Sequence, residues 1–192
     1  MPESGGVGHP ITSFARSAHL TLLLGGARSG KSALAVELGT RHAGGVTFVA
    51  TSPPMDGDLR DRIARHRAER PPWPTVEEPH DLTRALAEAG DDLVVLDCLT
   101  LWVNNLLHRG DSDADVAALS ATTAAAAAGR AAPTVVITNE VGLGVHPETD
   151  LGRRYRDLLG RVNQQWARAA DVALFLVAGR AIPLSDPWTY LR

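Results

Sequence analysis

Short continuous apolar runs recur along the chain and are separated by longer segments with a helical pattern. Five runs of four to six residues cover residues 20–24, 46–50, 93–96, 134–138 and 172–177. Runs of this length predict strands rather than helices. Strands that are apolar on both faces are typical of a parallel sheet that is covered by helices. The pattern therefore predicts the buried parallel sheet of an α/β protein.

The segments between these runs predict the helices. They cover residues 32–42, 58–69, 81–89, 99–107, 111–130 and 151–170. Alanine dominates the segment 111–130 and favours a helix strongly. Gly44 and Pro71 lie just after two of the segments and are typical helix terminators. Strands that alternate with helices predict one domain over residues 20–192, a mostly parallel sheet with helices on both faces.

Composition narrows the class of function. The chain has 192 residues, of which 44% are hydrophobic and 21% charged, and a formal net charge of −3, so it lacks the strongly basic character of a general nucleic-acid binder. No apolar run approaches the roughly 20 residues that span a bilayer. Residues 1–19 lack the apolar core of a secretory signal and predict a flexible leader. We therefore expect a cytoplasmic protein.

A phosphate-binding loop follows the first predicted strand. The segment fits the pattern G-x-x-x-x-G-K-[ST], in the strand–loop–helix context that the pattern requires. Glycines allow the main chain to wrap closely around an anion, and its N–H groups and the helix N-terminus then face the phosphates. Lysine can reach the β- and γ-phosphates, and the serine hydroxyl can bind Mg²⁺. The residues are Gly25, Gly26, Ala27, Arg28, Ser29, Gly30, Lys31 and Ser32.

An acidic residue completes this candidate site. Asp97 follows the apolar run 93–96, and ligands of open α/β sheets bind outside the carboxyl ends of the strands. A carboxylate there can hold Mg²⁺ directly or through water, although an aspartate that starts a turn would give the same pattern. Ser32 and Asp97 are therefore the predicted metal ligands. Cys98 is the only cysteine, which excludes an intramolecular disulfide and predicts a small buried residue.

Four segments together resemble the bifunctional adenosylcobinamide kinase / adenosylcobinamide-phosphate guanylyltransferase family. The resemblance runs from about Leu20 to about Leu184. The phosphate loop is common to many enzymes, whereas Thr-Asn-Glu-Val-Gly followed by Arg-Val-Asn-Gln is much more specific. The four segments are Gly25–Ser32, Asp97–Asn105, Thr138–Gly144 and Arg161–Gln164.

The resemblance implies two reactions of cobalamin assembly. A triphosphate first phosphorylates the aminopropanol hydroxyl of adenosylcobinamide. GTP then donates GMP to that phosphate through a guanylylated histidine, which gives adenosylcobinamide-GDP and pyrophosphate. The resemblance also implies GTP, ATP and Mg²⁺ as cofactors. It implies adenosylcobinamide and its phosphate as partners, and a homotrimer as the assembly.

His66 is the histidine that the resemblance indicates. A neutral imidazole is a competent nucleophile near pH 7, and the arginines around it could neutralise charge that develops on a phosphoryl group. Without the resemblance, the residues around His66 favour a solvated helix position over a nucleophile. By resemblance Glu77 binds the guanine or its ribose, with Glu78 one position away as the alternative. The other nucleotide-contacting residues that the resemblance implies are Ala50, Thr51, Ser52, Arg67, Ala68, Glu69 and Arg70.

Two other functions fit the phosphate loop. A GTP-hydrolysing switch normally carries an Asn-Lys-x-Asp signature, but this chain has no Asn-Lys pair and Lys31 is its only lysine. A kinase for a different small alcohol would form no covalent GMP adduct. Asn139 or Glu140 is expected to line the site in each case, because both follow the run 134–138 at the same sheet edge as Asp97.

Overall fold

The computed structural model describes residues 18–52 and 70–191, and within them it confirms the predicted α/β fold. A seven-stranded sheet has the order β3-β2-β4-β5-β1-β6-β7. All neighbouring strands are parallel except for the antiparallel pair β6 and β7. The strands are β1 Leu20–Gly25, β2 Val46–Ala50, β3 Thr75–Glu77, β4 Leu93–Asp97, β5 Thr134–Asn139, β6 Val172–Val177 and β7 Arg180–Pro183.

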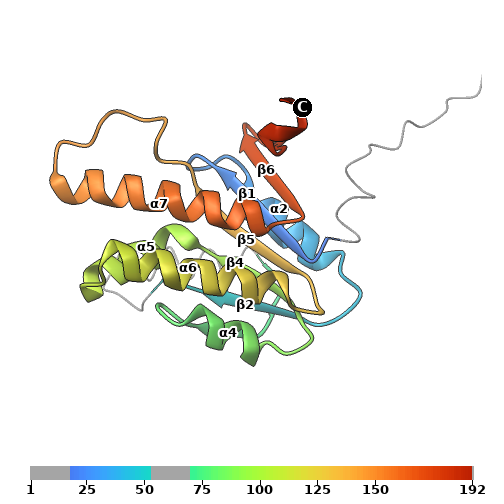
Figure 1. Cartoon of the computed structure of the whole chain (residues 1–192). Coiled ribbons are helices and arrows are strands. Elements are labelled where there is room, and N and C mark those ends of the chain that lie inside the picture. Colours follow the sequence, from blue (N-terminus) through green and yellow to red (C-terminus); the bar gives the residue numbers. More distant parts are fainter. Residues whose placement is uncertain (1–17, 53–69, 192) are drawn as a thin grey trace, which may run out of the picture.

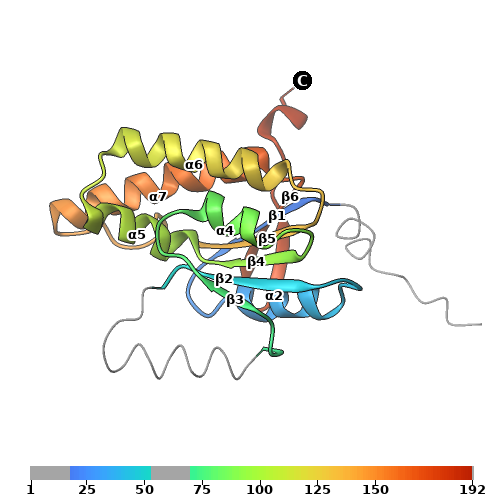
Figure 2. The same ribbon diagram turned by 90° about the horizontal axis from the view of Figure 1, so that it is seen from below.

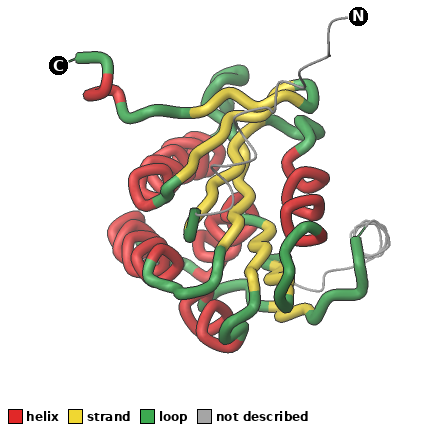
Figure 3. Tube along the Cα trace, turned by 90° about the vertical axis from the view of Figure 1, so that its right-hand side faces the viewer, coloured by secondary structure: helices red, strands yellow, loops and turns green. Residues whose placement is uncertain are grey.

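Helices cover both faces of the sheet unequally. Among the described residues, α2 lies alone on one face, and the other four helices lie on the opposite face (Figures 1 and 2). Figure 3 shows the strands between these two helical layers. The helices are α2 Lys31–Thr40, α4 Leu82–Glu88, α5 Leu99–Arg109, α6 Asp113–Ala128 and α7 Asp150–Ala169, and a short 3₁₀ turn η1 covers Pro187–Thr189.

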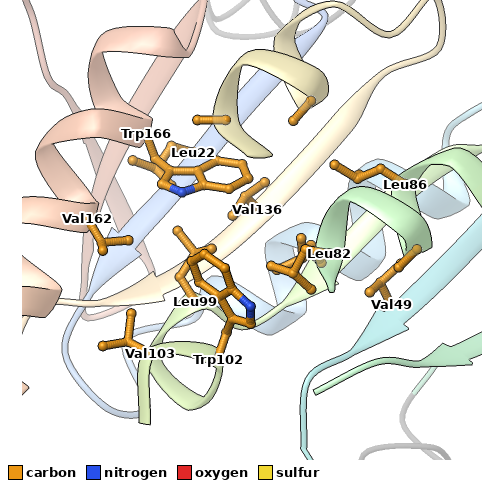
Figure 4. Close-up of a cluster of buried hydrophobic side chains, with 14 of the residues drawn as sticks. Leu22, Val49, Leu82, Leu86, Leu99, Trp102, Val103, Val136, Val162 and Trp166 are labelled. Atoms are coloured by element: carbon orange, nitrogen blue, oxygen red, sulfur yellow. The ribbon is translucent and has the colours of Figure 1, made fainter. Parts of the chain in front are cut away.

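The sheet buries a separate hydrophobic cluster on each face. The larger cluster lies beneath α4, α5, α6 and α7, and contains the fully buried Trp102 and Trp166 together with Leu22 and Val136 of the central strands (Figure 4). The smaller cluster lies beneath α2 and includes Leu23. Leu22 and Leu23 point to opposite faces because successive side chains of a strand alternate. This two-sided burial explains why the strands read as continuous apolar runs.

Three elements were missed by the sequence pattern: β3, β7 and η1. The strand β3 has only three residues, Thr75–Glu77, too few to produce a periodic signal. The strand β7 ends in Pro183 and is mostly exposed, which suits its place at the sheet edge. Every predicted strand exists, and helix boundaries differ from the predicted ones by one or two residues. The predicted helix over 58–69 and the leader up to residue 17 lie outside the described residues.

Candidate active site

The phosphate loop connects β1 to α2 through three residues with special backbone conformations. Gly25 has φ 158°, Arg28 φ 56° and Gly30 φ 103°. A Cβ atom built on Gly25 would lie 2.3 Å from the carbonyl oxygen of Leu176, so no larger residue fits there. Gly30 is the N-cap of α2 and needs its left-handed conformation to start the helix at Lys31. The motif glycines thus shape the turn, as the sequence predicts.

Lys31 lies across the loop. Its Nζ donates hydrogen bonds to the carbonyl oxygens of Gly25 and Gly26, at 2.9 and 2.7 Å, and to Oγ of Ser29 at 3.3 Å. Only 6% of the residue is exposed. Burial lowers the pKa of Lys31, although the nearby Asp97 opposes this shift by favouring the charged form. The loop carbonyls therefore hold a desolvated cation at the turn where phosphates are expected.

The ends of adjacent strands bring the other predicted residues to the same edge. In the register of the sheet, Ala50 of β2 is paired with Glu77 of β3 on one side and with Asp97 of β4 on the other. Nearer the loop, Asn139 of β5 is paired with Gly25. The structure thus aligns at one edge residues that are more than 100 positions apart in the sequence, as expected for a parallel sheet.

A pocket with a volume of about 370 Å³ lies between α2 and this edge of the sheet. Ser32 and Asp97 share it with Arg70, so three predicted site residues come together. The guanidinium of Arg70 lies 4.0 Å from the centre of the Phe48 ring and donates a hydrogen bond to Thr75. The cation–π contact and the hydrogen bond together hold the Arg70 side chain at the wall of the pocket. The lining residues are Ser32, Ala33, Val36, Phe48, Arg70, Val95, Asp97 and Ile137.

The two adjacent glutamates have different environments. Glu78 is buried, and its carboxylate accepts hydrogen bonds from the main-chain N–H groups of His80 and Asp81 and pairs with Arg84. Burial would raise the pKa of Glu78, but these hydrogen bonds and the arginine outweigh it and lower the pKa. Glu77 is exposed at the end of β3. Glu78 is thus engaged in the protein's own structure, and Glu77 is the accessible one of the pair.

Thr51 is fully buried and holds the segment that carries Asp97. Its hydroxyl accepts from the N–H of Cys98 and donates to the carbonyl oxygen of the same residue, both at 2.8 Å. The main-chain N–H of Thr51 donates to the carbonyl oxygen of Asp97. Asn105 donates to the carbonyl oxygen of Thr51. Every polar group of Thr51 therefore has a partner within the protein, and the residue connects β2 to β4.

Replacing Thr51 with valine is expected to lower the free energy of unfolding by about 2–4 kcal/mol, because it leaves the buried N–H and C=O of Cys98 without that partner. Urea denaturation measures this change. Thr122→Val is the control, because the Thr122 hydroxyl bonds only to Ala118 on the exposed side of α6 and its loss should cost less than about 0.5 kcal/mol. Equal losses in the two variants would contradict the bracing role of Thr51.

Asn163 joins the two segments on which the family resemblance depends most. Its Oδ1 accepts from the Thr138 hydroxyl at 2.7 Å, and its Nδ2 donates to the carbonyl oxygen of Asn139 at 3.0 Å. The N–H of Asn139 donates to the hydroxyl of Thr100. The next residue, Glu140, donates its N–H to Gly25. The segments at 138–144 and 161–164 thus support the loop-facing end of β5 together, a role that their sequences alone do not reveal.

Cys98 matches its predicted role as a small buried residue. Burial raises the pKa of its thiol to about 12, so it is neutral near pH 7 and is not an active nucleophile. The structure leaves the predicted nucleophile untested, because His66, Arg67, Ala68 and Glu69 lie outside the described residues. Within the described ranges no helix is long and apolar enough to cross a membrane.

The loop, its lysine and a carboxylate two strands away define a nucleotide-binding P-loop protein of the α/β class. The sequence model of the cobinamide kinase / cobinamide phosphate guanyltransferase family matches residues 21–184. The chain therefore belongs to this family, and it is an enzyme of the kinase and guanyltransferase type. The match confirms the resemblance that the four sequence segments indicated.

Individual relatives agree with the family match. The bifunctional adenosylcobalamin biosynthesis protein CobP of Pseudomonas aeruginosa is 44% identical over 170 residues, which cover 85% of this chain and 95% of that protein. The proteins named CobU of Escherichia coli and Salmonella typhimurium are each 38% identical over 180 residues, 86% of this chain and 99% of theirs. A solved structure, the flagellar accessory protein FlaH of Methanocaldococcus jannaschii, is 15% identical with a TM-score of 0.48 over 87% of this chain and 78% of that one.

Proposed function

We propose that this chain phosphorylates the aminopropanol hydroxyl of adenosylcobinamide and then transfers GMP from GTP to the resulting phosphate. One observation carries the proposal: in a member of this family, Lys31 lies across the phosphate loop, with Ser32 and Asp97 in one adjoining pocket. A triphosphate on the loop would place its γ-phosphate at the edge where an acceptor can approach from solvent. Such reactions depend on positioning and charge neutralisation more than on covalent help from the protein.

In the kinase step the acceptor hydroxyl attacks the γ-phosphorus, the bond from this phosphorus to the β–γ bridging oxygen breaks, and the nucleoside diphosphate leaves. The hydroxyl proton passes to solvent or to a nearby base. Lys31 and the main-chain N–H groups of the loop stabilise the negative charge on the phosphates. ATP and GTP both fit this description, since the loop contacts only phosphates.

In the guanylyl step we assign the nucleophile to His66. An imidazole nitrogen attacks the α-phosphorus of GTP, the bond to the α–β bridging oxygen breaks, and pyrophosphate leaves. An oxygen of adenosylcobinamide phosphate then attacks the same phosphorus, which releases the imidazole and forms adenosylcobinamide-GDP. Because GMP passes through the protein, the covalent intermediate can be trapped without the corrinoid.

The guanosine is proposed to contact residues from the neighbouring strand ends. Arg70 at the pocket wall and the exposed Glu77 at the end of β3 are accessible to it. Ala50 ends β2 and pairs with Glu77 in the sheet, and Ser52 follows two residues later. Arg67, Ala68 and Glu69 remain predicted contacts. The buried Thr51 supports this edge through its bonds to Cys98 rather than offering a further polar group to the nucleotide.

The donor set of the pocket fits Mg²⁺. A serine hydroxyl and one carboxylate, together with phosphate oxygens and water, are the oxygen ligands that Mg²⁺ takes in phosphoryl-transfer sites. Bound Mg²⁺ would neutralise charge on the β- and γ-phosphates. In the described part of the chain no three His, Cys, Asp or Glu side chains gather into a metal cage. Ser32 and Asp97 are thus proposed to bind the ion with the nucleotide rather than before it.

Replacing Asp97 with asparagine is expected to raise the Mg²⁺ concentration for half-maximal kinase activity by at least about tenfold, the scale on which lost ligand-shell groups weaken metal sites. A Mg²⁺ titration at saturating nucleotide measures the shift. The control is Asp91→Asn, which removes an exposed carboxylate two residues before the start of β4, whereas Asp97 lies at its end. If the titration curve of Asp97→Asn overlaid that of the wild type, Asp97 would not be a ligand of Mg²⁺.

We place the enzyme in the cytoplasm, where both triphosphates are available, and propose a homo-oligomer, a trimer, that binds no nucleic acid. The acceptors are adenosylcobinamide and its phosphate. Because a corrinoid is much larger than the pocket of about 370 Å³, most of it must lie outside this pocket. Light scattering of the purified chain tests the assembly.

The function is tested by incubating the purified protein with adenosylcobinamide, Mg²⁺ and either triphosphate, and separating the corrinoid products. We expect adenosylcobinamide phosphate first and adenosylcobinamide-GDP after addition of GTP. With α-labelled GTP and no corrinoid, we expect a protein-bound label that is labile in acid and stable in base. Phosphorylation of adenosylcobinamide without any protein-bound label would support the kinase activity and contradict the guanylyltransferase activity. GTP hydrolysis without transfer to any acceptor would favour the switch.

A further inference from the structure

The turn between β6 and β7 lies directly against the phosphate loop. The N–H of Gly179 donates a hydrogen bond to the carbonyl oxygen of Ser29 at 3.0 Å. A Cβ atom on Gly30 would lie 3.2 Å from Cα of Gly179, tighter than ordinary contact. Leu176, on the β6 side of the same hairpin, closely approaches Gly25. The β6–β7 hairpin therefore packs against both ends of the phosphate loop, at Gly25 and at Gly30.

The hairpin turn has a conformation that glycine favours. Its two central residues, Ala178 and Gly179, have φ values of 51° and 71°. Positive φ at both central positions is the pattern of the two-residue turns that match the twist of the strands they join. A Cβ atom on Gly179 would meet nothing within 4 Å, so a side chain has space there and only the backbone conformation opposes it.

The contact determines how one peptide unit of the loop is oriented. The Ser29–Gly30 peptide is planar and trans, so its carbonyl oxygen and the N–H of Gly30 point in opposite directions. Since the oxygen is bonded to Gly179, the N–H of Gly30 points away from the hairpin. N–H groups of successive loop residues are what bind phosphate in such turns. Without the Gly179 bond, this peptide could rotate and withdraw its N–H.

We infer that the β6–β7 turn is part of the nucleotide site and that Gly179 is a positioning residue, which orients the Ser29–Gly30 peptide for phosphate binding. The inference rests on the proposed role of Gly25–Ser32 as the phosphate site. Binding free energies are reciprocal, so a nucleotide on the loop must in turn stabilise the turn. The β6–β7 turn thus has a role in nucleotide binding that neither the phosphate-loop motif nor the family comparison assigns to it.

The first test compares three variants by calorimetric binding of GTP with Mg²⁺ and by thermal unfolding. Gly179→Pro removes the N–H and is also incompatible with the φ of 71° at this position, so we expect its GTP Kd to rise by at least about tenfold, the scale of one lost hydrogen bond. Gly179→Ala keeps the N–H but strains the turn, so a smaller rise is expected. Gly90→Ala is the matched control, because Gly90 also has a positive φ of 54° with open space around it, at the end of α4.

The second test uses wild-type protein and does not depend on a variant that folds. GTP with Mg²⁺ should slow amide hydrogen exchange in the peptide that contains Gly179 and Arg180, while exchange over α6 changes much less. A Gly179→Pro Kd equal to that of Gly90→Ala, or no protection of the turn by bound GTP, would overturn the inference. Wild-type protein that bound no nucleotide would instead overturn the proposed function.

Discussion

Replacing Lys31 with alanine is expected to abolish use of triphosphates in the kinase reaction. The ammonium group is held at the turn by the carbonyl oxygens of Gly25 and Gly26 and is desolvated. A positioned charge in such a place stabilises a phosphoryl transition state much more strongly than a solvated one does. We expect kcat/KM for the triphosphate to fall by about 10²–10³-fold or more, the scale seen when one such group is removed.

The loss should be specific to function. Removing the ammonium of Lys31 relieves a desolvation cost but also takes a donor away from the carbonyl oxygens of Gly25 and Gly26. These two effects oppose each other, so the change in thermal stability should be small compared with the loss of activity. Arg41→Ala is the control at the other end of α2, where Arg41 forms an exposed ion pair with Glu37. Its kcat/KM should match that of the wild type. Undiminished phosphorylation by Lys31→Ala would place the phosphate site elsewhere.

Replacing His66 with alanine is expected to eliminate the labelled GMP adduct and the formation of adenosylcobinamide-GDP. In the proposed scheme His66 is the only nucleophile that forms a covalent bond to GMP, so the protein-bound label should fall to background. Phosphorylation of adenosylcobinamide should continue, because that step transfers the γ-phosphate directly to the acceptor. Denaturing gel analysis after incubation with α-labelled GTP and Mg²⁺, with a parallel corrinoid kinase assay, measures both results.

The matched control for this variant is His108→Ala, since His108 is exposed in the last turn of α5. It should retain both the adduct and the kinase activity. A label that persists in His66→Ala would assign the nucleophile to another residue. Loss of kinase activity together with the label would mean that His66 acts in a step common to both reactions.

The phosphate loop shows how much a contiguous segment can reveal. The conformations of Gly25 and Gly30 belong to local backbone geometry, so the spacing of the glycines and Lys31 was sufficient to predict the turn. The apolar runs predicted five strands for a related reason: burial on both faces leaves a continuous signal in each strand. Asp97 was predicted at the correct edge because it directly follows one of these runs.

Other features of the site could not be found in this way. Arg70 lines the same pocket as Ser32 because β3 pairs with β2 and brings the segment before β3 against Phe48. A three-residue strand has no sequence signal strong enough to predict that pairing. The difference between Glu77 and Glu78 likewise depends on Arg84 and on main-chain donors that only the folded chain brings together.

By itself, the sequence determined the fold class, the phosphate loop with its lysine, the acidic strand end and the family. Each of these is encoded by neighbouring residues. Only the tertiary structure decided that Thr51 holds Cys98, that Asn163 joins two distant segments, and that Gly179 contacts the loop. These contacts depend on strand order and register, which arise when segments far apart in the chain are buried together, and no local pattern specifies them.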